Sequence, residues 1–104
     1  MRVDWKESAV NDVEEVYEKL KINRGKLSAD KEIDKIFDKT TLLENFPKMG
    51  AVQENHNAGG ETVRYLVQGN YKILYQINTS KGLVEILAVF DTRRDPSKML
   101  SKEE

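Results

Sequence analysis

The chain has 104 residues, 38% of them hydrophobic, which is the size and apolar content of one folded domain over residues 1–104. Because the sequence has no cysteine and a single histidine, it excludes disulfides and argues against a zinc site, and we expect neither a metal nor a cofactor. A net charge of −1 gives no basic field for sequence-independent binding of nucleic acid, and no apolar run has membrane or signal-peptide length, so we expect a cytoplasmic protein without a membrane partner.

The chain begins with the pattern of a strand followed by a helix. Residues 2–6 alternate apolar and polar side chains, which is typical of a strand. From Ala9 to Leu20 the apolar residues recur at helical spacing, so they lie on one face of a helix. Ser8 precedes this helix and is expected to cap it with its hydroxyl. Gly25 is expected to end it in the left-handed conformation.

A second helix is predicted from about Ser28. Its apolar residues repeat the spacing of the first helix as far as Thr40, and Pro47 stops the continuation of this apolar side. Two amphipathic helices with a short connection predict a helical hairpin. Three aromatic residues at core spacing are expected to pack inside: Trp5, Tyr17 and Phe37.

The second half of the chain has the pattern of a sheet. Residues 53–60 are polar and rich in glycine, which predicts a loop. Three strands are then predicted, separated by tight turns, at residues 62–67, 71–77 and 83–90. The last of them is nearly continuous in apolar residues, as in a strand buried on both faces. The fold class is therefore α+β, with a helical hairpin packed on one face of the sheet.

Four stretches carry motifs beyond the element pattern. They are Trp5-x-x-Ser8-Ala9, Leu43-x-x-Phe46-Pro47-x-x-Gly50, residues 63–75 with Gly69-Asn70-Tyr71-Lys72-Ile73-Leu74-Tyr75, and residues 86–96 with Phe90-Asp91-Thr92-Arg93-Arg94. With these motifs in this order, the chain resembles the toxins of the RelE/ParE superfamily, from bacterial type II toxin–antitoxin modules. The resemblance covers nearly all of residues 2–99.

The resemblance implies a toxin that inhibits bacterial growth and that a cognate antitoxin protein neutralises. It also implies the fold of that family, in which an N-terminal strand and a helical hairpin pack on a three- to four-stranded, mainly antiparallel sheet. The superfamily has two branches. The ParE-like branch poisons DNA gyrase, whereas the RelE-like branch is a metal-independent endoribonuclease that cleaves ribosome-bound mRNA. Whether this chain is an enzyme therefore depends on the branch.

Cleavage of mRNA by a ribose 2′-OH needs a base, an acid, and cations for the charge that develops on phosphorus. Lys72 falls where the hairpin of the family carries a functional Arg or Lys, and Arg93 and Arg94 fall where the family places another. The resemblance implies that these cations contact phosphate or the target, and Tyr65 is a further candidate as a proton donor. Cleaving relatives carry extra lysines and a tail Tyr or His at positions that hold other residues here: Val63, Tyr65, Val67, Lys98 and Met99.

The sequence thus supplies cations without an acid–base pair, which favours the gyrase-type branch and leaves mRNA cleavage as the alternative. Relatives that poison gyrase commonly show an Arg-x-Leu and Gly-x-Tyr-Arg pattern, which is matched by Arg64, Leu66, Gly69, Tyr71 and Lys72. A second alternative is a non-toxic relative that acts as a protein-interaction domain.

Each candidate also has a structural interpretation. Lys72 can be an ordinary exposed strand residue, and Arg93 and Arg94 can form ion pairs with the neighbouring aspartates. Arg64 alternates with apolar residues, so it can face the helices and pair with a carboxylate there.

Overall fold

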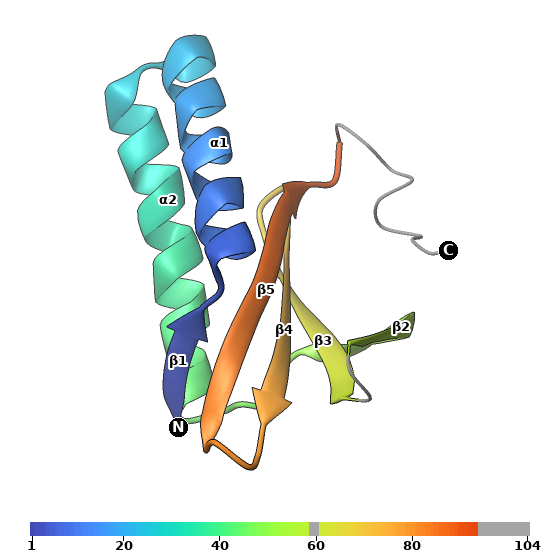
Figure 1. Ribbon diagram of the computed structural model, residues 1–104. Coiled ribbons are helices and arrows are strands. Elements are labelled where there is room, and N and C mark those ends of the chain that lie inside the picture. Colours follow the sequence, from blue (N-terminus) through green and yellow to red (C-terminus); the bar gives the residue numbers. More distant parts are fainter. Residues whose placement is uncertain (59–60, 94–104) are drawn as a thin grey trace.

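The computed structural model describes residues 1–58 and 61–93, and for residues 54–58 and 61 it describes the backbone alone. Two helices and a short 3-10 helix pack with a sheet (Figure 1). In chain order the elements are β1 (Arg2–Trp5), α1 (Glu7–Arg24), α2 (Lys26–Thr41), η1 (Leu42–Glu44), β2 (Ala51–Ala58), β3 (Glu61–Gln68), β4 (Tyr71–Asn78) and β5 (Leu83–Asp91).

The strands form one mixed sheet in the order β1-β5-β4-β3-β2. β1 runs parallel to β5, and the other neighbours are antiparallel. The β3–β4 hairpin turns at Gly69, whose φ of 61° suits a glycine. α1 and α2 lie together on one face of the sheet (Figure 1). Successive residues of a strand point to opposite faces, so neighbours in β4 alternate between the helix side and the outer side.

The core lies between the helical hairpin and the sheet. α1 contributes a stripe with the helical spacing that the sequence predicts: Ala9, Val13, Val16 and Leu20 are all buried. Ile73, Tyr75 and Ile86 meet the helices from β4 and β5 and have no exposed surface. Burial of such side chains is the main term that stabilises a domain of this size.

The predicted α+β class is confirmed, and the predicted loop at 53–60 is wrong as far as residue 58. β2 extends through Ala58 and pairs with β3, with a register shift between Val52 and Asn57. β2 is an edge strand, and its pairing depends on backbone groups of β3 rather than on a run of apolar side chains. That is why a polar, glycine-containing stretch reads as a loop.

The predicted helix ends also need correction. α1 begins at Glu7, and its N-cap residue Lys6 makes no side-chain cap. The hydroxyl of Ser8 instead donates to the carbonyl of Leu87 in β5 at 2.9 Å. α2 begins at Lys26, directly after Gly25, and so earlier than the sequence pattern indicates.

Two of the three aromatic residues expected in the core pack against it, and the third is only partly covered. Trp5 and Tyr17 are half-buried against the core. The ring of Phe37 lies 5.1 Å from that of Trp5, measured between centroids, yet Phe37 remains 43% exposed. Phe37 therefore forms part of the surface of α2 as well as of the packing.

A hydrogen-bonded hinge connects the helices to β2. The Tyr75 hydroxyl donates to the carbonyl of Pro47 at 2.8 Å and accepts from the Gly50 N–H at 2.9 Å. The Arg64 guanidinium donates to the Gly50 carbonyl at 3.0 Å. The sequence allowed Arg64 to face the helices and pair with a carboxylate there, but the partner of its guanidinium is the backbone carbonyl of Gly50 at this hinge.

Candidate functional site

Lys72 lies on the outer face of the sheet, opposite the helices. Its side chain is only 5% exposed, so it is not the ordinary exposed strand residue that one interpretation of the sequence predicts. The ammonium lies 4.1 Å from the centre of the Tyr65 ring, a cation–π distance. Burial lowers the pKa of the Lys72 amine below its usual value.

Arg93 follows β5 and forms an ion pair with Asp91. The two side chains meet at 3.0 Å, and Asp91 also accepts from the backbone N–H and the Nε of Arg93. This carboxylate holds the pKa of the Arg93 guanidinium above its usual value. The ion pair with Asp91 that the structural interpretation expects is therefore present, and half of the Arg93 side chain remains exposed. Arg94 lies outside the described residues.

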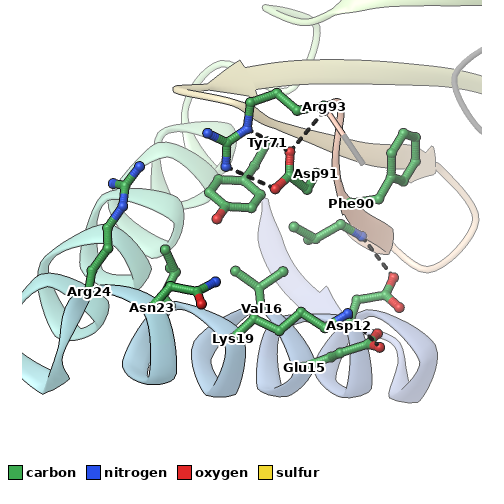
Figure 2. A pocket seen from close by; sticks show the side chains of 12 residues that line it. Asp12, Glu15, Val16, Lys19, Asn23, Arg24, Tyr71, Phe90, Asp91 and Arg93 are labelled. Atoms are coloured by element: carbon green, nitrogen blue, oxygen red, sulfur yellow. Dashed lines mark hydrogen bonds and ion pairs between the residues drawn. The ribbon is translucent and has the colours of Figure 1, made fainter. Parts of the chain in front are cut away.

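The structure does not bring Lys72 and Arg93 together. Arg93 lies beside Tyr71, a residue of the helix-side core (Figure 2). Lys72 is the next residue of β4 and so points to the opposite face. The cations that sequence reasoning grouped into one site thus lie on two faces of the sheet.

Tyr65 is the candidate proton donor that does lie beside Lys72. Its ring is half-buried and contacts the ammonium through its π face. Within residues 1–53 and 62–93, no group of three histidine, cysteine or carboxylate side chains could hold a metal ion. Across the described helices, none is long and apolar enough to cross a bilayer.

A cleft of about 740 Å³ lies on the helix side, between α1 and the end of β5 (Figure 2). Val16, Leu20 and Val89 give it apolar lining. Charged residues lie along it in sequence order on α1, with carboxylates first and cations later: Asp12, Glu15, Lys19 and Arg24. Arg93 and Asp91 line the same end as Tyr71.

Comparison with known proteins identifies the family. The model of the ParE toxin of the type II toxin–antitoxin system parDE matches residues 3–96. The chain belongs to the ParE toxin family. Comparison with curated protein sequences gave no match.

Two solved structures share the fold of this ParE-family toxin. One is described as a chromosomal ParDE toxin–antitoxin system from P. aeruginosa, with a TM-score of 0.72 and 19% identity, covering 88% of this chain and 95% of that chain. The other is an archaeal RelE–RelB complex from Pyrococcus horikoshii, with a TM-score of 0.59 and 15% identity, covering 90% of this chain and 97% of that chain. At these identities the likeness shows the fold alone.

The cleft of this ParE-family toxin contains residues that sequence reasoning did not select for a site. Tyr71 appeared only as part of a motif, and Arg24 was not singled out. The signal that was available is the alternation of β4, which places Tyr71 on the face opposite Lys72. The position of α1 along β5 depends on tertiary packing, which the sequence pattern does not specify.

Proposed function

We propose that this ParE-family toxin arrests bacterial growth by binding and poisoning DNA gyrase, and that a cognate antitoxin neutralises it. The family match supports the toxin class. The observation that carries the choice of mechanism is the separation of Lys72 and Arg93 onto opposite faces of the sheet. Phosphodiester cleavage needs cations and acid–base groups around one phosphate, whereas inhibition by binding does not.

Of the two candidate cations that the structure describes, Lys72 and Arg93, Arg93 is better placed to contact a target. Its side chain is half exposed and Asp91 orients it. A guanidinium held in this way offers further N–H donors to a phosphate or carboxylate of the target. Arg94 belongs to the same proposal through its position next to Arg93.

Ribosome-dependent mRNA cleavage is the second candidate function, and one observation favours it. The Lys72 amine with its lowered pKa lies beside the Tyr65 phenol, so a base and a proton donor are neighbours. The exposure of Lys72 is only 5%, so a phosphate reaches it only after a rearrangement of its surroundings.

Purified gyrase and the purified toxin separate the two functions. We expect the toxin to inhibit ATP-dependent supercoiling, and we expect Arg93→Ala to weaken inhibition by about tenfold, the effect of losing one charged contact. Lys35→Ala is the matched control, because Lys35 is an exposed cation of α2 outside the cleft. Inhibition by this control should equal that of the wild type.

Mapping of new RNA 5′ ends after brief induction of the toxin alone tests the second function in cells. Growth arrest without new ends, together with inhibited supercoiling, supports the proposal. Cuts within translated codons that disappear in Lys72→Ala, with gyrase unaffected, would overturn it and establish mRNA cleavage. Absence of growth arrest would instead indicate the non-toxic relative.

A further inference from the structure

The tip of the helical hairpin carries a concentration of positive charge. Residues 19–31 hold five cations and one carboxylate, a net charge of +4, in a chain whose net charge is −1. The rest of the chain therefore carries −5. The cations of this segment, which we call the basic tip, are Lys19, Lys21, Arg24, Lys26 and Lys31. Such a separation of charge turns the tip toward a polyanion, although the protein as a whole is weakly acidic.

The basic tip stands clear of the sheet. Gly25 joins the end of α1 to the start of α2, and this connection lies well beyond the end of β5 in Figure 1. A Cβ on Gly25 would have no atom within 4 Å, so the connection is open to solvent. Arg24 also borders the cleft beside α1, whereas Lys21 and Lys26 do not line it. The tip can therefore reach a partner that the sheet does not contact.

The helix dipoles explain only part of this charge. Lys21 and Arg24 lie in the last turn of α1, where cations complement the negative end of the dipole. Lys26 is the first residue of α2, where a cation opposes the positive end of the dipole, and the first turn of α2 has no acidic residue. Its ion pair with Asp30, at 2.9 Å between two exposed groups, offsets little of this cost. The stability of α2 therefore gives no reason for a cation at position 26.

Two aliphatic side chains of the tip are not used by the core. Ile22 of α1 is 80% exposed and Leu27 of α2 is 70% exposed, the highest values among the large apolar side chains that the structure describes. They lie on either side of Gly25, one on each helix. A single exposed apolar residue is ordinary, but two beside the same connection form an apolar surface surrounded by cations. Such a surface suits a partner that offers both anionic and apolar groups.

The cations at the end of the tip are available to a partner. The Arg24 guanidinium makes no ion pair or hydrogen bond within the part of the chain that the structure describes. Lys21 pairs with Glu18 at 3.5 Å, a long contact between exposed groups that a phosphate can replace at little cost. A guanidinium binds phosphate through two parallel hydrogen bonds, so Arg24 is the strongest single candidate for a phosphate contact.

We propose that the basic tip binds duplex DNA, with its cations on the phosphates and with Ile22 and Leu27 against a groove. Charge complementarity carries the choice of partner, since the cations lie on both helices and duplex DNA offers phosphates on both strands. Aliphatic side chains at such contacts insert between base steps. The inference rests on the proposed function and deepens it: the DNA is the segment that gyrase holds, and the toxin contacts this DNA as well as the enzyme.

DNA fits the observations better than a lipid surface or an acidic protein. Two aliphatic side chains bury too little apolar surface to hold a protein at a bilayer. An acidic protein surface matches the charge, but an enzyme that acts on DNA already presents a denser row of anions. Both alternatives are outcomes that the experiments distinguish.

Fluorescence anisotropy with a short labelled DNA duplex tests the contact on the whole toxin. We expect the logarithm of the association constant to fall against the logarithm of the salt concentration with a slope of about −3, as for roughly three phosphate contacts. Arg24→Gln combined with Lys26→Gln should weaken binding at low salt by about tenfold and make the slope shallower by about two. The control combines Lys35→Gln with Lys81→Gln, which removes the same charge from exposed positions outside the tip, and its affinity should stay within about twofold of the wild type.

The apolar part of the contact needs a variant of its own. Ile22→Ser combined with Leu27→Ser should weaken binding by about fivefold without a change in the salt slope, because no phosphate contact is lost. Both positions are exposed, so circular dichroism should show the helix content of the wild type. An unchanged affinity would overturn the groove contact.

Three results of the titrations would overturn the assignment of the tip to DNA. The first is full binding by the variant that lacks Arg24 and Lys26. The second is tighter binding of an RNA duplex of the same sequence. The third is binding to vesicles of phosphatidylglycerol without binding to the duplex, which would assign the tip to a lipid surface.

Supercoiling by purified gyrase separates this inference from the proposed function. Weaker inhibition by the variant without Arg24 and Lys26, with wild-type inhibition by the Lys35 and Lys81 control, supports the inference. If the tip variant loses inhibition but still binds the duplex, the tip contacts the enzyme itself, and the inference is overturned. If the wild type does not inhibit gyrase, the proposed function fails, and the duplex titration still decides whether the tip binds DNA.

Discussion

Lys72 has a charged group at a position that is only 5% exposed, and its ammonium lies over the ring of Tyr65. Two effects on its charge oppose each other there. Desolvation disfavours the ammonium, and the π face of the ring favours it. The pKa of Lys72 is lowered, which indicates that the protein stabilises the ammonium less than water does.

Replacing Lys72 by methionine is therefore expected to stabilise the protein. Methionine has a similar length and no charge, so the variant has no ammonium to desolvate when it folds. Its free energy of unfolding near neutral pH should therefore be higher than that of the wild type by about 1 kcal/mol. Because the folded-state pKa is lower than the unfolded one, the cost is present near neutral pH. It fades as the pH rises through the folded-state value toward the ordinary value of 10.5.

Urea unfolding near neutral pH and near the ordinary pKa of lysine measures this difference. Lys35→Met is the control, since Lys35 is exposed on α2, and it should leave the unfolding free energy within about 0.5 kcal/mol of the wild type. A Lys72→Met protein that is less stable than the wild type near neutral pH would show that the contact with Tyr65 outweighs desolvation.

The hinge between η1 and β2 requires a glycine at position 50, because the surrounding atoms leave no room for a side chain there. A Cβ on Gly50 would lie 2.6 Å from the Tyr65 carbonyl oxygen and 2.7 Å from the Tyr75 hydroxyl. The carbonyl is backbone of β3 and cannot move without disturbing the sheet. The hydroxyl is fixed by its two hydrogen bonds at the same hinge.

Gly50→Ala is expected to lower the free energy of unfolding by about 3 kcal/mol, the upper range for overpacking. Thermal unfolding measures the loss. Gly25→Ala is the comparison, because an added Cβ on Gly25 has nothing within 4 Å and the substitution therefore adds no clash. Its φ of 91° and ψ of 164° place it in a region that is essentially confined to glycine, so the expected cost is conformational strain alone, about 1–3 kcal/mol. Equal losses in the two variants would show that the hinge yields to the added methyl group.

The elements that could be predicted are those whose own residues carry the signal. The stripe from Ala9 to Leu20 and the apolar run of β5 show their burial in their spacing, and both are confirmed. β2 was missed because its pairing is held by the backbone of β3. The sequence placed Lys72 in a hairpin strand and Arg93 at the end of the last strand. It did not show that the two side chains lie on opposite faces, which follows from the alternation of β4 and from the course of the chain after β5.

At the scale of the whole molecule, a buried carboxylate connects three adjacent strands. Glu85 of β5 is only 4% exposed. It accepts from Gln76 of β4 at 2.7 Å and from Asn78 at 3.4 Å, and it forms an ion pair with Lys6, just after β1, at 3.2 Å. The Gln76 hydrogen bond contributes most to holding the pKa of Glu85 below its usual value, with Lys6 and Asn78 acting in the same direction.

This network predicts a specific loss of stability in acid. The Glu85 carboxyl has a lower pKa in the folded state than in the unfolded state. Its contribution to the free energy of unfolding is therefore full above the ordinary pKa of 4.5 and is lost as the pH falls through the folded-state pKa.

Glu85→Gln should lower the free energy of unfolding by about 1–3 kcal/mol near neutral pH, because the new amide group points N–H donors at the donors of Lys6 and Gln76. Urea unfolding over this pH range should show the gap to the wild type closing in acid. Asp4→Asn, at the exposed position beside Glu85 in the register, should show little gap at any pH. A Glu85→Gln gap that stays constant down to low pH would mean that the shape of the side chain, and not its charge, connects β1, β4 and β5.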